Sequence, residues 1–116
     1  MIAVIFEVES AGADGRSRYL ELAAGLAPNL PAQDGFISVE RFQSLSDPGK
    51  ILSLSFFRDE AAVAAWRNRP EHRDAQTAGR NGVFSAYRLR IAHVVRDYGL
   101  TARDEAPSDS RRAHED

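Results

Sequence analysis

Apolar residues recur at every second position along four stretches of the chain, which is the pattern of β-strands that bury one face. In the first stretch, Ile2, Val4, Phe6 and Val8 share one face. Between the first two stretches, apolar residues recur every three to four positions, the pattern of a helix with one buried stripe. The pattern therefore predicts a helix over Arg16–Ala27 and strands over Ile2–Glu9, Phe36–Ser44, Lys50–Arg58 and Val83–Asp97.

The stretch from Asp59 to Gly82 predicts two helices that meet at Pro70. Asp59 can cap the first helix, because its side-chain oxygen accepts a hydrogen bond from an unpaired backbone N–H. The alanines that follow favour a helix, whereas proline lacks the N–H that a helix interior requires and is suited to a first turn. Gly79 and Gly82 are expected to end the helical region.

The predicted order of elements is β-α-β-β-α-β, which is typical of the ferredoxin-like α+β fold. In this fold a four-stranded antiparallel sheet carries its helices on one face. The second and third strands are separated by the turn signal Asp47-Pro48-Gly49, so we expect them to form an antiparallel hairpin.

The sheet face without helices is expected to be too apolar to remain in water. The residues assigned to the helix side of the second and third strands are Ile37, Val39, Leu52, Leu54 and Phe56. The open face would then carry Ile5, Phe42, Ile51 and Phe57. A second copy packed sheet to sheet would cover it, so we expect a homodimer. A monomer with tolerated surface apolar residues is the alternative.

The composition is that of a small folded protein. The 116 residues suit one domain, and a hydrophobic fraction of 43% supports a core. We place the domain at residues 1–98. Residues 99–116 form a polar tail almost free of large apolar side chains, which we expect to be mobile or to lie on a partner.

Charge and residue content argue against several classes of protein. The formal net charge of −2 gives no electrostatic basis for binding nucleic acid or an acidic membrane surface. The absence of cysteine excludes disulfides, thiolate catalysis and cysteine metal sites. No apolar run is long enough to span a bilayer, and the apolar start has no basic region before it, so we expect a cytoplasmic protein.

Trp66 and His72 are the leading candidate site residues, because they lie on two segments hinged at Pro70 and can face one cavity. The plain alternatives are that the tryptophan anchors the core and that the histidine is a solvated surface residue. The three histidines, His72, His93 and His114, lie on different predicted elements without ligand spacing, so we expect no metal site.

Four short segments carry a resemblance to a known family. They are DGFISVERF (34–42), SFFRDE (55–60), AWRNRPEHR (65–73) and VVRDY (94–98). Together they resemble the antibiotic biosynthesis monooxygenase domain, over residues 1–98. The resemblance implies a small homodimer in which two ferredoxin-like subunits form an α+β barrel, in agreement with the open face inferred above.

In the cofactor-free branch of this family, molecular oxygen oxidises a phenol to a quinone. The pocket there uses an asparagine one turn before the helix tryptophan, the tryptophan, a tyrosine after it and an arginine of the last strand. This chain has Ala62, Trp66 and His72 in the first three places, and it offers Arg88 or Arg90 for the fourth. In the haem-degrading branch, a first-strand asparagine, the helix tryptophan and an iron-binding histidine form the set.

For the haem branch, this chain has Glu7 in place of the strand asparagine but keeps Trp66 and His72. We therefore expect a monooxygenase that acts on a small electron-rich aromatic without metal or flavin. Trp66 would stack on the ring, His72 would act as base and Arg88 would hold the phenolate. The alternatives are a haem-binding monooxygenase with His72 as iron ligand, and a non-catalytic dimeric ligand-binding module, since one fold hosts many functions.

Overall fold

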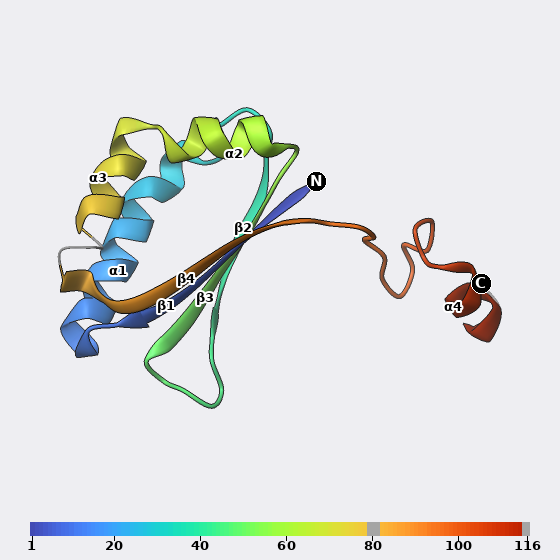
Figure 1. Ribbon diagram of the computed structural model, residues 1–116, viewed down its shortest axis with the longest axis horizontal. Coiled ribbons are helices and arrows are strands. Elements are labelled where there is room, and N and C mark those ends of the chain that lie inside the picture. Colours follow the sequence, from blue (N-terminus) through green and yellow to red (C-terminus); the bar gives the residue numbers. More distant parts are fainter. Residues whose placement is uncertain (79–81, 115–116) are drawn as a thin grey trace.

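A four-stranded antiparallel sheet with helices on one face forms the body of the molecule (Figure 1). The computed structural model describes residues 1–78 and 82–114. Its elements are β1 (Ile2–Ser10), α1 (Gly12–Leu26), the 3-10 helix η1 (Ala27–Asn29), β2 (Phe36–Gln43), β3 (Lys50–Phe57), α2 (Glu60–Arg67), α3 (Pro70–Ala78), β4 (Phe84–His93) and α4 (Ser108–His114). The strands lie in the order β2-β3-β1-β4, which confirms the predicted ferredoxin-like α+β fold.

The break between α2 and α3 follows the sequence signals. Asp59 caps α2, because its Oδ1 accepts a hydrogen bond from the backbone N–H of Ala62 at 2.8 Å. Pro70 begins α3, as predicted. Gly82 adopts a positive φ of 105°, whereas Gly79 lies outside the described residues. α1 starts at Gly12 rather than at Arg16, and no side chain caps it.

β2 begins where the chain passes closest to α2. Gly35 has a φ of 81°, and a Cβ placed on it would lie only 2.5 Å from the Cβ of Ala62. Only glycine combines this backbone angle with this approach at low cost. The contact holds α2 against the sheet and thereby positions Trp66 in the last turn of that helix.

The faces of β3 are the reverse of the prediction. Phe57 is 1% exposed and packs beneath the helices with Ile2 and Val63, and Ile51 lies on the same side. The register explains this arrangement: Ile2 pairs with Phe57, and cross-strand partners point to the same face. Because β3 carries large apolar residues on both faces, its alternation alone could not decide which set meets the helices.

On β2, Val39 lies on the helix side as predicted, but Ile37 is 52% exposed. A register shift between Phe36 and Ser38 interrupts the alternation there. The face without helices, called the open face from here on, therefore carries Ile5, Phe42, Leu52, Leu54 and Phe56.

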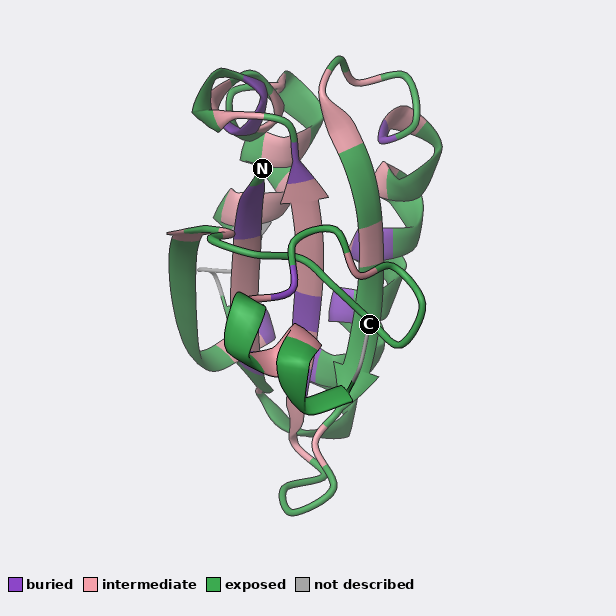
Figure 2. Cartoon of the chain, turned by 90° about the vertical axis from the view of Figure 1, so that its right-hand side faces the viewer, coloured by how far each residue is buried: buried purple, intermediate pink, exposed green. Residues whose placement is uncertain are grey.

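After β4 the chain leaves the body as an arm over residues 94–114, on the side opposite the helices (Figure 1). Figure 2 views the molecule from that side and shows the arm and α4 in front of the sheet. Contacts within the arm bury Ala106 and place the Arg103 guanidinium 5.5 Å from the Tyr98 ring centre, while Val95 and Leu100 are 77% and 96% exposed. The sequence analysis did not predict α4. None of the helices in the described ranges is long and apolar enough to cross a membrane.

Candidate active site

A largely apolar cavity of about 360 Å³ lies between the sheet and the helices, a size that suits a small molecule. Its apolar wall includes Val4, Phe6, Tyr19, Leu22, Leu26, Val39, Trp66, Phe84, Tyr87, Leu89 and Ile91. Its polar side chains are Arg41, Ser53, Ser55, Arg67, His72 and Gln76. A cavity of this kind favours a ligand with an apolar body and few polar groups.

Trp66 and His72 lie together at this cavity, across the break at Pro70. Their ring centres are 5.0 Å apart, with an angle of 34° between the planes. The Arg69 guanidinium lies 5.8 Å from the Trp66 ring centre. The neighbouring cation and the imidazole therefore both restrict the orientation of the indole.

Arg88 lies on the opposite face of the sheet from Trp66 and His72. On β4 the cavity-facing residues are Tyr87, Leu89 and Ile91. Because successive side chains of a strand point to opposite faces, Arg88 and Arg90 lie on the open face. There Arg88 pairs with Glu7 across the strands, and Arg90 Nη1 lies 3.2 Å from Glu7 Oε2. The expected convergence of Trp66, His72 and Arg88 in one chain is therefore not found.

Arg41 is the strand cation that does line the cavity. Its Nε donates to the hydroxyl of Tyr19 at 3.3 Å, and its guanidinium lies 5.9 Å from that ring centre. Among the described residues, no carboxylate forms a salt bridge with Arg41. The sequence analysis missed it, although Arg41 stands two positions after Val39 and hence on the same strand face.

A chain of hydrogen bonds reaches His72 from the outer side of α3. Arg73 donates through Nη2 to Asn68 Oδ1 at 2.5 Å and through Nη1 to Gln76 Oε1 at 3.0 Å. The Gln76 Nε2 then lies 2.9 Å from His72 Nδ1, which is also 3.5 Å from the carbonyl oxygen of Arg67. No sequence motif marks this network, because it depends on the rotation of α3.

The His72 ring is held neutral. Burial lowers the pKa of His72 below its ordinary value, and the charge of Arg73 acts in the same direction, against an opposing hydrogen bond to the Arg67 carbonyl. A lowered pKa leaves the imidazole uncharged at neutral pH. The site thus combines an aromatic wall, a neutral imidazole and a guanidinium.

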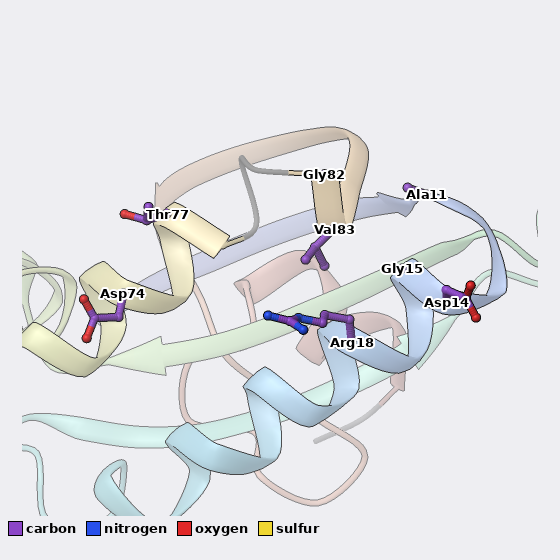
Figure 3. Close-up of a pocket in the computed structure, with 8 residues that line it drawn as sticks. All are labelled: Ala11, Asp14, Gly15, Arg18, Asp74, Thr77, Gly82 and Val83. Carbon is purple, nitrogen blue, oxygen red and sulfur yellow. The ribbon is translucent and has the colours of Figure 1, made fainter.

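A second, shallower groove lies between α1 and α3 (Figure 3). Arg18 of α1 reaches toward it, and Asp74 and Thr77 of α3 border it. It contains none of the predicted site residues. Within residues 1–78 and 82–114, no three histidine, aspartate or glutamate side chains gather as a metal site.

Comparison with protein families gives one match that covers most of the chain. The family described as antibiotic biosynthesis monooxygenase matches residues 1–78. A curated relative from Pyricularia oryzae, named jasmonate monooxygenase ABM, is 47% identical over 95 residues, which are 82% of this chain and 44% of the relative. The chain thus spans less than half the length of that relative. The uncharacterised YqjZ of Bacillus subtilis is 32% identical over 81% of this chain and 79% of its own length.

Solved structures share the fold at low sequence identity. A candidate antibiotic biosynthesis monooxygenase from Deinococcus radiodurans superposes with a TM-score of 0.76 at 17% identity, over 87% of this chain and 99% of its own. Rv0793 from Mycobacterium tuberculosis gives a TM-score of 0.74 at 17% identity, over 84% of this chain and 98% of its own.

Proposed function

The chain belongs to the antibiotic biosynthesis monooxygenase family, and from that premise we propose that it oxidises a small hydroxylated aromatic in the cavity between sheet and helices. One observation carries the proposal: a single apolar cavity holds an aromatic wall, a guanidinium and a neutral imidazole, in Trp66, Arg41 and His72. An anionic aromatic needs these three groups to be bound and oxidised.

Binding follows from the lining of the cavity. The apolar wall takes the ring system out of water, and Trp66 offers a face for stacking. Arg41 holds the phenolate oxygen by a charge-assisted hydrogen bond, which lowers the pKa of the bound phenol. Arg41 takes the part that the sequence analysis gave to Arg88.

The reaction needs no external reductant. The phenolate gives an electron pair to O₂, so that a C–O bond forms at the carbon para to the oxygen and the negative charge moves to the peroxide. Loss of the proton on that carbon supplies the pair for a second C=O bond, the O–O bond breaks, and hydroxide leaves. One oxygen atom enters the quinone and the other becomes water, so electrons and atoms balance without metal or flavin.

A second substrate class is favoured by the Pyricularia oryzae relative, which is named for jasmonate. Jasmonate also has an apolar body and one anionic oxygen group, so Arg41 would hold its carboxylate. Hydroxylation of a saturated carbon by O₂ consumes two electrons that the substrate does not supply. A jasmonate-type substrate would therefore require an added reductant such as NADH.

Haem, the alternative cofactor, fits the site poorly. A histidine that ligates iron must present a lone pair to the metal. Because an arginine can only donate, Arg73 fixes Gln76 with Oε1 outward and Nε2 toward His72 Nδ1. Nδ1 then accepts, and the proton of the neutral ring sits on Nε2, the nitrogen left for an occupant of the cavity. Added haemin is accordingly expected to give no sharpened Soret band that His72→Ala abolishes.

The substrate class is tested by oxygen uptake. Metal- and flavin-free protein is expected to consume O₂ with phenols or naphthols that carry a hydrogen para to the hydroxyl, and jasmonic acid is assayed with and without NADH. Arg41→Leu is expected to raise KM by about 10–100-fold, because it removes a charge-assisted hydrogen bond. Arg16→Leu on the exposed side of α1, outside both the cavity and the open face, is the matched control and should leave KM unchanged. Uptake at the buffer rate with every substrate would favour the ligand-binding module instead.

We also propose that the protein works as a homodimer joined through the open face. Ile5, Phe42, Leu52, Leu54 and Phe56 form an apolar surface that a second sheet would cover. Phe42 is 43% exposed in the single chain, so at least part of this surface lacks cover from the chain itself.

Light scattering at micromolar concentration is expected to give twice the chain mass. Phe56→Asp should shift the protein toward monomer, because the charge would be buried in the interface. Leu45→Asp is the control, since Leu45 is fully exposed in the loop between β2 and β3. A monomeric wild-type protein, or equal effects of the two variants, would contradict this assembly.

A further inference from the structure

We infer that Gln76, oriented by Arg73, holds His72 as the Nε2–H tautomer, so that His72 donates a hydrogen bond to the peroxide anion instead of removing the phenol proton. The tautomer follows from the hydrogen bonds alone. The role toward the peroxide rests on the proposed function. The inference replaces the base role that the sequence suggested for His72.

The orientation of the Gln76 amide is determined by Arg73, which can donate hydrogen bonds but cannot accept them. The guanidinium of Arg73 carries only N–H groups, so the atom of Gln76 that faces it must be the oxygen. Arg73 is itself anchored on Asn68 Oδ1, which restrains the guanidinium at both ends of its planar fork. The amide nitrogen of Gln76 is thereby directed at His72 Nδ1 from 2.9 Å.

The competing partner of Nδ1 is weaker. The Arg67 carbonyl would accept from a protonated Nδ1, but it lies 3.5 Å away, at the outer limit of a hydrogen bond. A proton on Nδ1 would also face the N–H₂ group of Gln76, with two donors opposed. The network therefore disfavours both the Nδ1–H tautomer and the imidazolium.

The spacing along α3 makes the arrangement local. His72 and Gln76 are four positions apart and Arg73 and Gln76 three, so all three side chains meet on one helix surface. Gln76 also lines the cavity beside His72. The donor is thus set before any substrate enters, which is the condition under which hydrogen bonds lower a barrier most.

In the reaction, the donor is needed after O₂ has added. Negative charge then lies on the peroxide, away from the oxygen held by Arg41, and His72 lines the cavity beside Trp66, where its Nε2–H can donate. The phenol proton does not pass to Nε2, because that nitrogen is already protonated. Gln76 is accordingly a positioning residue that acts through His72.

The tautomer is measured by ¹⁵N NMR of the histidine ring, in the full chain without substrate. Wild-type His72 is expected to show a protonated Nε2 and an unprotonated Nδ1. In Gln76→Glu the carboxylate accepts a hydrogen bond from Nδ1, so the ring should instead show a protonated Nδ1 and an unprotonated Nε2. A wild-type ring protonated on Nδ1 would overturn the inference, whatever the protein oxidises.

The catalytic consequence is measured with the best substrate from the oxygen-uptake panel. Gln76→Glu is expected to lower kcat by about 10²-fold with little change in KM, since a misdirected donor is equivalent to a missing one. Thr77→Glu adds the same charge to the exposed side of α3 and is the matched control. If the variant carries the proton on Nδ1 while kcat stays at the wild-type value, the donor role of His72 is wrong.

Discussion

Replacing His72 with alanine is expected to lower kcat by about 10²–10³-fold, with a much smaller change in KM. His72 is the proposed donor beside Trp66, and removal of one oriented donor to a developing anion has an effect of this size. Substrate affinity depends mainly on the apolar wall and Arg41, which the substitution leaves in place. The measurement is steady-state oxygen uptake with the preferred phenol.

His72→Gln separates donation from proton removal. A glutamine side chain retains N–H donors but cannot act as a base near neutral pH, so it should recover part of the lost kcat. His93→Ala, at the exposed end of β4, is the control and should keep full activity. Full activity in His72→Ala would show that the site is misassigned.

Local signals in the sequence predicted those parts of the fold that local chemistry determines. The Asp59 cap, the break at Pro70 and the hairpin of β2 and β3 each depend on a few neighbouring residues, and each is present. The same break predicted that Trp66 and His72 can face one cavity. Their contact follows because the proline ends one helix and begins the next.

The remaining features depend on pairing between distant strands. Alternate residues of β4 face the cavity and the open face, so the strand register decides on which side Arg88 lies. In the register of β4 against β1, Tyr87 and Leu89 face the cavity and Arg88 does not. A shift of one residue would reverse this result, and no local pattern distinguishes the two. Arg41 could have been found, because its strand face follows from Val39 once that residue is assigned to the core.

The faces of β3 also depend on pairing between distant strands, which is why the prediction reversed them. A substitution of Phe57 tests the observed arrangement. Phe57 is 1% exposed and packs against Ile2, Ala62 and Val63, with the Phe36 ring centre 5.9 Å away. These neighbours come from β1, α2 and the start of β2, so they cannot all close around the space that a smaller side chain would leave.

Phe57→Ala is therefore expected to lower the free energy of unfolding by about 3–5 kcal/mol, a large part of the roughly 5–15 kcal/mol that stabilises a small protein. Urea unfolding should show this loss at every protein concentration, because the cavity lies within one chain. Phe56→Ala is the matched control from the open face. Its effect should depend on protein concentration, since dimer contacts stabilise by mass action. If Phe56→Ala gave the larger, concentration-independent loss, the faces of β3 would be those that the sequence first suggested.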